Sequence, residues 1–284
     1  MDVDGLSQLL TPQGWALLEA LPPYREDAAL QLAERLKAEG VDPALVAAAL
    51  TQSRLRARAQ AKFGPFADGM LFTPEGLEQA TRLDVAARHA QRYAAAGVDR
   101  VADLGCGIGG DAMAMAGLDL GVLAVERDEL TAAVATVNLR HWPEAEVRCE
   151  DATATDLSGV RGAYLDPARR TSSGRRVLDP WKASPSWDVV LSVAEHLPAT
   201  GAKVAPGIPH AMLPPGTETQ WVSVDGDVVE AGVWFGPLAR HGVRRSALLL
   251  RGGEAATVDD VGLPVPDVGG VGAYLYEPDG AVVR

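Results

Sequence analysis

The sequence has 284 residues, a formal net charge of −12, 47% hydrophobic residues and a mean hydropathy near zero. A chain of this length and composition can bury a substantial core and is typical of a globular rather than a disordered protein. Its acidity argues against sequence-independent adhesion to nucleic acid, which needs a positive field. No apolar run reaches the length of a membrane-spanning helix, so we expect no membrane partner.

Cysteine and histidine usage argues against a metal site. Cys106 and Cys149 are the only cysteines, and the five histidines are scattered, with no HxxxH or HxxEH spacing. Two thiols cannot form a disulfide framework or a four-cysteine zinc site. Few cysteines, and an N-terminus that lacks a basic segment, favour a cytoplasmic location.

The first hundred residues are predicted to be mostly helical. Helical spacing of apolar residues, with proline or glycine as stops, predicts helices at residues 6–21, 26–39 and 44–62. The third begins after Asp42 as N-cap, with Pro43 at the first helical position. Its second half carries basic residues at i, i+4 and i+8, which are Arg54, Arg58 and Lys62. A solvated helix face and an anion-facing surface explain this pattern equally well.

A strand–helix alternation follows one further helix, at residues 73–96. We expect strands at residues 99–104, 121–126, 145–149, 162–166 and 202–206, and helices near 110–117, 128–141 and 187–198. Such alternation indicates a right-handed, mostly parallel sheet. The expected fold is therefore α/β, with a Rossmann-like doubly wound sheet that follows a helical N-terminal domain at residues 1–72.

The alternation then gives way to antiparallel signals. Residues 219–224 and 228–236 read as two strands joined by an Asp225-Gly226 turn, and residues 246–251 read as another strand. Residues from Gly252 onward are predicted to be a linker or loop. The sheet is thus expected to end in antiparallel strands near residue 251.

The stretch VADLGCGIGGD at residues 101–111 is the centre of the predicted fold. Gly105, Gly107 and Gly110 satisfy G-x-G-x-x-G between a strand and a helix. Glycines permit a tight turn and let a ligand approach the backbone without meeting a Cβ atom. Dinucleotide enzymes and methyltransferases share this motif, so the motif alone does not identify the ligand.

Acidic residues near successive strand ends favour one ligand. Asp103 and Asp111 bracket the glycine loop and would repel a pyrophosphate, whereas they would stabilise the sulfonium and ammonium groups of S-adenosylmethionine (SAM). A unit charge pair about 4 Å apart is worth on the order of 4 kcal/mol at an effective dielectric of about 20. Glu126 is placed to accept the ribose hydroxyls, which would suit NAD equally well, and Asp151 to accept an adenine amine. Together the four acids favour SAM as the cofactor.

The series DLGCGIGGD, AVERD, CEDAT and LDPAR resembles the motifs of class I SAM-dependent methyltransferases. The chain is more closely similar to bacterial methyltransferases with a THUMP-like C-terminal domain, which are related to the RNA cap guanine methyltransferase (trimethylguanosine synthase) group. That likeness is carried by KFGPFADGMLFTPEGLEQAT, YLDPARRTSSGRR, KVAPGIPH and WVSVDGDVVEAGVWFGPLA.

The resemblance implies a methyltransferase domain at residues 73–251, and a linker with the start of an incomplete THUMP-like domain at residues 252–284. A THUMP-like domain would imply RNA as a partner. The cofactor-binding residues implied by the motifs are Asp103, Gly105, Cys106, Gly107, Gly110, Asp111, Glu126, Arg127, Asp151, Ala152 and Asp166.

The LDPAR motif suggests the methyl-acceptor site. Asp166 and Pro167 match the start of the D/N/S-P-P-aromatic tetrad of amino-methyltransferases, in which the polar side chain orients an exocyclic amine. Ala168 and Arg169 depart from it, although a guanidinium plane can itself stack on a base. A carboxylate that caps the following turn is the structural alternative for Asp166. The DPAR of 5-methyluridine RNA methyltransferases requires a cysteine after the fifth strand, and this sequence has none there, so we reject that chemistry.

These observations lead to one hypothesis and three alternatives. We expect a SAM-dependent N-methyltransferase that acts on an exocyclic or ring nitrogen of an RNA base. The alternatives are a small-molecule methyltransferase, a non-catalytic SAM- or RNA-binding protein and, more distantly, an NAD(P) oxidoreductase. Arginines after the acceptor motif could bind phosphate or pair with nearby acids. The expected substrate-binding residues are Arg169, Arg170, Arg54, Arg58 and Lys62.

Overall fold

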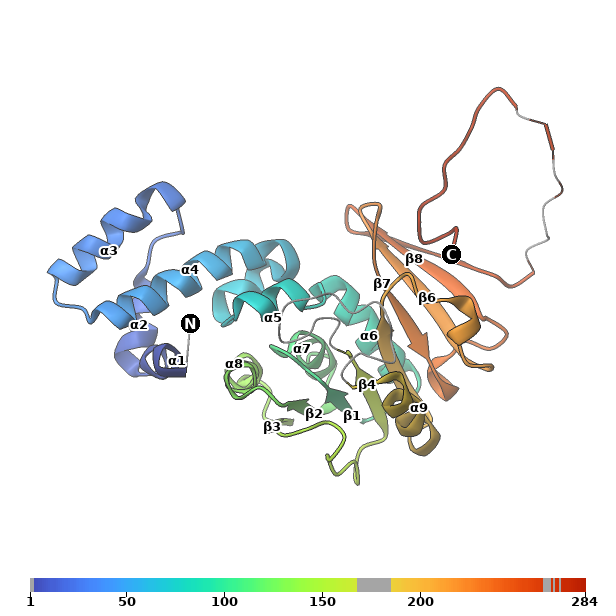
Figure 1. Ribbon diagram of the computed structural model, residues 1–284, viewed down its shortest axis with the longest axis horizontal. Coiled ribbons are helices and arrows are strands. Elements are labelled where there is room, and N and C mark those ends of the chain that lie inside the picture. Colours follow the sequence, from blue (N-terminus) through green and yellow to red (C-terminus); the bar gives the residue numbers. More distant parts are fainter. Residues whose placement is uncertain (1–2, 168–184, 263–266, 268, 271) are drawn as a thin grey trace. The chain divides into compact units, whose positions relative to one another are not determined.

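The computed structural model describes residues 3–167, 185–262, 267, 269–270 and 272–284 (Figure 1). The chain forms two compact units. The first consists of Met1–Gln91 and Cys106–Thr155, and the second of Arg92–Gly105 and Asp156–Arg284. The chain thus passes from the second unit back into the first within the glycine loop, between Gly105 and Cys106.

Helices make up the N-terminal part of the first unit. They are α1 (Val3–Leu9), α2 (Pro12–Ala20), η1 (Glu26–Ala28), α3 (Ala29–Ala38), α4 (Pro43–Phe63) and η2 (Gly64–Gly69). The predicted first helix is split because the Thr11 side chain caps α2 by accepting from Gly14 N. Asp42 caps α4 as predicted, since its carboxylate accepts from the amides of Ala44 and Leu45.

The predicted helix at residues 73–96 is also two helices, α5 (Pro74–Gln79) and α6 (Leu83–Ala95). The chain becomes extended at Ala80, with φ −57° and ψ 138°. Lys62 Nζ donates to the carbonyl oxygens of Leu77, Glu78 and Ala80, at 2.8, 2.8 and 2.7 Å. Because the last carbonyls of a helix have no partner within it, an ammonium group from α4 stabilises the end of α5.

The rest of the first unit contains two parallel strands and two helices. α7 (Gly110–Ala116), β2 (Gly121–Glu126), α8 (Glu129–Leu139) and β3 (Ala145–Cys149) follow one another in the chain. β2 pairs with β3 so that Glu126 lies opposite Cys149. α8 begins at the N-cap Asp128 and contacts both strands. The predicted bounds of the two strands are confirmed, and those of the two helices are correct to within two residues.

The second unit contains a sheet with the strand order β1-β4-β5-β7-β6-β8-β9. β1 (Arg100–Leu104), β4 (Gly162–Leu165) and β5 (Ala199–Val204) are parallel. β7 (Asp227–Trp234) is antiparallel to both β5 and β6 (Glu218–Val224), and β8 (Arg245–Arg251) is parallel to β6. β6, β7 and β8 lie side by side in Figure 1. α9 (Trp187–His196) contacts β4 and β5, and short 3₁₀ turns follow at η4 (His210–Met212) and η5 (Gly236–Leu238).

Two glycine-containing turns shape the antiparallel end of this sheet. Asp225 and Gly226 both have positive φ, 52° and 94°, as the predicted hairpin requires. The predicted loop from Gly252 onward is wrong for six residues, because β9 (Glu254–Asp259) pairs antiparallel with β8. Gly252 and Gly253, at φ 57° and 84°, form a second turn of the same kind. The α/β fold with a mostly parallel sheet and terminal antiparallel strands is confirmed.

An aromatic cluster forms the core of the second unit. Trp234 stacks on Tyr164 at 6.2 Å between ring centroids and meets Tyr93 edge-on at 6.4 Å. A Cβ atom on Gly201 of β5 would lie 2.5 Å from the Trp234 ring. The indole therefore requires a glycine on the neighbouring strand.

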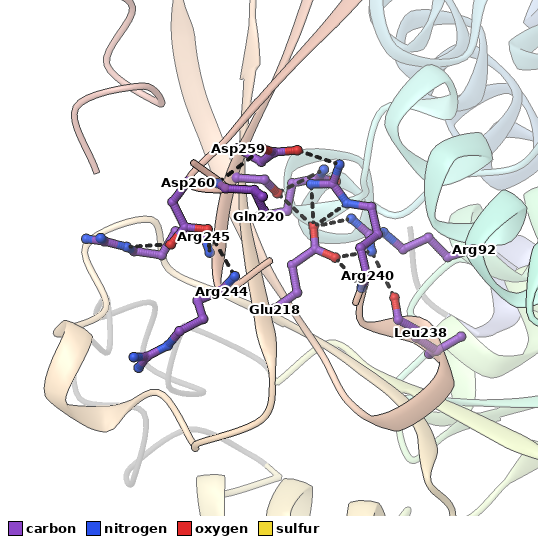
Figure 2. Close-up of polar contacts among 11 residues, drawn as sticks. Arg92, Glu218, Gln220, Leu238, Arg240, Arg244, Arg245, Asp259 and Asp260 are labelled. Atoms are coloured by element: carbon purple, nitrogen blue, oxygen red, sulfur yellow. Dashed lines mark hydrogen bonds and ion pairs between the residues drawn. The ribbon is translucent and has the colours of Figure 1, made fainter. Parts of the chain in front are cut away.

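A buried acid ties α6 to this sheet. Glu218 is fully buried, and Arg92 Nη1 and Nη2 donate to its two oxygens at 2.8 and 2.9 Å (Figure 2). Arg240 adds side-chain bonds of 2.9 and 3.1 Å and a backbone bond of 2.9 Å. Burial raises the pKa of Glu218, but the bonds from Arg92 and Arg240 outweigh burial and lower the pKa to about 2.

Candidate cofactor and acceptor site

The glycine loop of the first unit has one face open to a ligand. Cys106 is buried, and its amide donates to Val125 O at 3.0 Å, which holds the start of this part of the loop against β2. Gly107 has φ +56°, and a Cβ atom there would meet no atom within 4 Å. Gly107 therefore has the backbone conformation and the open surroundings that close approach of a ligand requires.

Glu126 lies beside this loop, as expected from the sequence. Gly107 N donates to Glu126 Oε2 at 3.1 Å, and Asp128 N donates to Oε1 at 2.9 Å. A carboxylate has about four lone-pair sites, so these two bonds leave capacity to accept ribose hydroxyls. Arg127, the next residue, is exposed. The end of β2 and the glycine loop thus form one face of a candidate cofactor site.

Gly110 has a packing role that the motif did not reveal. A Cβ atom on Gly110 would lie 3.5 Å from the Phe63 ring, and one on Gly109, at φ +85°, would lie 3.6 Å from the Leu139 side chain. Gly110 thus packs against α4 and the neighbouring Gly109 against α8. The assignment of Gly110 to cofactor binding stays a prediction.

The two acids that bracket the loop are both buried. Asp111 Oδ1 lies 2.8 Å from His89 Nδ1, and both side chains are buried. Asp103, on β1 of the second unit, is 1% exposed. The sequence predicted carboxylates facing a cationic ligand but did not anticipate that His89 would hold Asp111. A lone histidine on an apolar helix face carried no functional signal.

Asp151 forms a turn after β3. Its Oδ1 accepts from Thr153 Oγ1 at 2.6 Å and from Thr153 N at 2.8 Å, and the residue is exposed. These hydrogen bonds from Thr153 lower the pKa of Asp151, so it is ionised at neutral pH. Ala152, between Asp151 and Thr153, is half-buried. Contact of this turn with an adenine ring stays a prediction.

In the second unit, strand register brings Gly105 next to the acceptor motif. Leu104 of β1 lies opposite Leu165 of β4, so Gly105 and Asp166 follow adjacent strand ends. A Cβ atom on Gly105 would lie 3.3 Å from the carbonyl oxygen of Asp166. The Asp166 side chain is 26% exposed, and Pro167 is buried.

Lys203 is a charged neighbour of Asp166 that the sequence analysis missed. Leu165 pairs with Ala202 of β5, so the next residue of each strand, Asp166 and Lys203, lie side by side. Lys203 Nζ forms an ion pair with Asp166 Oδ2, and the lysine side chain is only 2% exposed. The available signal was a single lysine within a strand of otherwise small or apolar residues. A buried ammonium group requires a counter-charge, which Asp166 supplies.

The expected phosphate-binding residues fall into three groups. Arg54 and Arg58 are exposed on α4. Lys62 is half-buried and donates to the three carbonyls at the end of α5, so we leave it out of the proposed anion surface. Arg169 and Arg170 lie outside the described residues, as do Ala168, Arg175 and Arg176.

Among the described residues, no group of three or more His, Cys, Asp or Glu is placed to hold a metal ion. No helix in this part of the chain has the length and apolar character to cross a bilayer.

Two curated proteins of Mycobacterium tuberculosis, from strains CDC 1551 and H37Rv, resemble the chain. Each is named an uncharacterised S-adenosylmethionine-dependent methyltransferase, and each is 32% identical to it over 241 residues. The match covers 81% of this chain and 64% of either relative, so the chain spans just under two thirds of the relatives' length. Both names specify the cofactor that the acidic residues and motifs led us to expect.

A solved structure extends the likeness to three dimensions. A protein of Porphyromonas gingivalis W83, described as a candidate methyltransferase, matches with a TM-score of 0.64 at 18% identity, over 92% of this chain and 73% of its own. The chain has a class I SAM-dependent methyltransferase fold. Within it, residues 2–59 match a family described as a domain of unknown function (DUF8688). The methyltransferase fold therefore follows a helical region that has a family of its own.

Proposed function

We propose that the chain binds SAM at the glycine loop and transfers its methyl group to a nitrogen atom held beside Asp166. The observation that carries this proposal is the register of β1, β4 and β5, which brings Gly105, Asp166 and Lys203 to one edge of the sheet. Ligands of parallel α/β sheets bind at the carboxyl ends of the strands. Gly105 and the acceptor motif thus lie at the kind of sheet edge where ligands bind.

The residues present fit the cofactor. Gly107 offers an open backbone face, and Glu126 beside it has acceptor capacity for the ribose hydroxyls. Asp151, ionised in its turn, would accept from the adenine amine. When bound, SAM supplies a methyl group that is already activated by its positive sulfur. The protein then needs to supply orientation rather than a nucleophile of its own.

Asp166 would orient the acceptor. Its carboxylate would accept a hydrogen bond from an amine N–H and so direct the nitrogen lone pair toward the methyl carbon. Lys203 holds Oδ2 of the same carboxylate from the buried side. Because Asp166 remains 26% exposed, a substrate amine can reach it from the open side.

We propose an RNA base as the acceptor. Exposed Arg54 and Arg58 on α4 support phosphate binding, and the LDPAR motif resembles that of enzymes that methylate amino groups. The net charge of −12 favours the alternative, a small-molecule acceptor, because it repels a polyanion. A non-catalytic SAM-binding protein is the third possibility.

Methyl-labelled SAM incubated with total RNA, and separately with a metabolite extract, tests these alternatives. The proposal predicts label in RNA. Label only in the metabolite fraction would favour a small-molecule acceptor, and cofactor binding without any transfer would favour the non-catalytic protein.

Asp166→Asn, combined with binding of S-adenosylhomocysteine, tests the acceptor site. Asparagine keeps an oxygen facing Lys203, so we expect cofactor affinity to be retained while turnover falls by on the order of 100-fold from lost orientation. Turnover equal to that of the unaltered protein would remove Asp166 from the mechanism.

A further inference from the structure

Residues Met70 to Thr73 form a buried extended segment whose backbone is bound by side chains. Each of its residues is at most 5% exposed. Gln52 of α4 makes two bonds to Phe72, donating to its carbonyl at 2.7 Å and accepting from its amide at 2.9 Å. Arg56 Nε, one turn further along α4, donates to Met70 O at 2.8 Å. α4 thus holds the segment through side-chain groups that replace the bonds of a neighbouring strand.

Asn138 of α8 binds the same segment and also binds the glycine loop. Its Oδ1 accepts from Leu71 N at 2.8 Å, and its Nδ2 donates to Leu71 O at 3.0 Å and to Ile108 O at 2.8 Å. Asn138 is 2% exposed. Ile108 lies between Gly107 and Gly109, so a single amide joins the helical region to the centre of the loop.

Direct packing reinforces this connection. A Cβ atom on Gly76 of α5 would lie 2.4 Å from Ile108 Cγ2, and Phe63 at the end of α4 lies against Gly110. α5 therefore contacts Ile108, whose carbonyl Asn138 binds, and α4 contacts the loop two residues later at Gly110. All of these residues belong to the first unit.

We infer that Asn138 is a positioning residue for the cofactor loop, and that the helical region through α5 is part of the cofactor site. This inference rests on the proposed function, because it takes the loop to bind SAM. Three of the loop's residues, Gly105, Gly107 and Gly109, have positive φ, and a glycine-rich loop without restraint samples many conformations. By fixing the Ile108 carbonyl, Asn138 keeps the loop in the conformation in which Gly107 N donates to Glu126. A loop that is already ordered loses less conformational entropy when the cofactor binds.

Two matched buried amides give a discriminating experiment. Asn138→Leu and Gln52→Met each remove an amide that holds the segment at residues 70–73, but only Asn138 also binds Ile108 O. Affinity for S-adenosylhomocysteine is measured by calorimetry, and hydrogen exchange is followed in a peptide that covers residues 105–113. Tm is recorded for both variants.

We expect both variants to lower Tm, but only Asn138→Leu to raise the Kd, on the order of tenfold, and to speed exchange in the loop peptide. A merely structural role for Asn138 predicts instead that the two variants alter Kd and loop exchange equally. That equality, or an unchanged Kd in Asn138→Leu, would overturn the inference.

A second variant covers the case in which Asn138→Leu does not fold. Gly76→Ala places a methyl group 2.4 Å from Ile108 Cγ2 and 2.6 Å from Thr73 Oγ1, the N-cap of α5, and leaves the Asn138 and Gln52 amides in place. We expect the same rise in Kd and faster loop exchange. Unchanged loop exchange and Kd in Gly76→Ala would then contradict the inference. If the unaltered protein does not bind S-adenosylhomocysteine, the proposed function fails, and loop exchange alone decides whether Asn138 positions the loop.

Discussion

Asp166 and Lys203 show how the environment of one residue depends on another. Lys203 is almost fully buried, and Asp166 is partly open to solvent. Removing one partner of a buried ion pair leaves an uncompensated charge, which costs on the order of 3 kcal/mol or more. Alanine at Asp166 would remove both the charge and the acceptor that Lys203 uses, whereas asparagine keeps an oxygen facing Lys203, so asparagine is the more informative change.

A double-mutant cycle measures this coupling. We expect Lys203→Met and Asp166→Asn each to lower the free energy of unfolding, and the double variant to be less destabilised than the sum by about 1 kcal/mol or more, because neither charge is then left alone. Urea unfolding of the four proteins checks this. Additive losses would show that the ion pair contributes nothing specific to the site.

The residues that could be predicted from sequence are those whose role follows from position in a motif. Glu126 lies at the end of β2 and beside Gly107, as expected. Asn138, His89 and Lys203 were missed because their importance depends on partners distant in the chain, or on a neighbouring strand that the sequence does not identify. For Lys203 the available signal was a single charge within a strand of small or apolar residues, and for His89 there was none.

At the scale of elements, tertiary contacts explain where prediction failed. The chain breaks between α5 and α6 at Ala80, where neither proline nor glycine marks the break in the sequence. Lys62 of α4 stabilises the end of α5 at this point. β5 was placed three residues too late because Ala199 and Gly201 are weak strand formers, yet Gly201 is required beneath Trp234. β9 was missed because Gly252-Gly253 was interpreted as a linker instead of a turn.

Three of the strands whose bounds were predicted to within one residue share a simpler property. β1, β2 and β4 are short apolar runs between turn residues, and they are almost wholly buried. Because both faces of a parallel sheet are covered, the apolar residues of such strands follow one another instead of alternating with polar residues. Local sequence therefore sufficed to locate these three strands.

Glu218 predicts an acid-dependent contribution to the stability of the sheet. Its folded pKa of about 2 lies below the ordinary value of 4.5, so its stabilisation is full above about pH 4.5 and is lost as the pH falls toward 2. Glu218→Gln should lose about 3 kcal/mol at pH 7, because it removes the charge that Arg92 and Arg240 require.

The difference in unfolding free energy between the unaltered protein and Glu218→Gln should shrink as the pH falls through that window. Denaturant unfolding at several pH values checks it, with the exposed Glu254→Gln on β9 as the control. A difference that does not change with pH would contradict the assigned pKa.

At the scale of the whole molecule, the contrast between net charge and local charge bears on the substrate. The chain carries −12 overall, yet no acid occurs between Pro43 and Ala67, the stretch that holds the exposed Arg54 and Arg58. An RNA substrate would have to be drawn to such local surfaces rather than to a general field. The proposal of RNA as partner therefore rests on local rather than net charge.

Charge reversal on α4 tests that dependence. Arg54→Glu with Arg58→Glu should weaken RNA binding and reduce the slope of log K against log salt by about 2 or somewhat less, as two phosphate contacts are lost. As a control, replacement of Arg35 and Lys37 on α3 by glutamate should leave the slope of log K against log salt unaltered. An affinity that does not respond to salt in any of these proteins would argue against phosphate contacts and for a small-molecule acceptor.

The cofactor claim is tested most directly by calorimetric titration of S-adenosylhomocysteine, and of NAD, into the unaltered protein and into Gly107→Val. Valine at φ +56° is strained, and its side chain would occupy the open face of the loop beside Glu126. We predict saturable binding of S-adenosylhomocysteine to the unaltered protein, none to Gly107→Val and none of NAD to either. Failure of the unaltered protein to bind S-adenosylhomocysteine, or equal binding by Gly107→Val, would contradict the account.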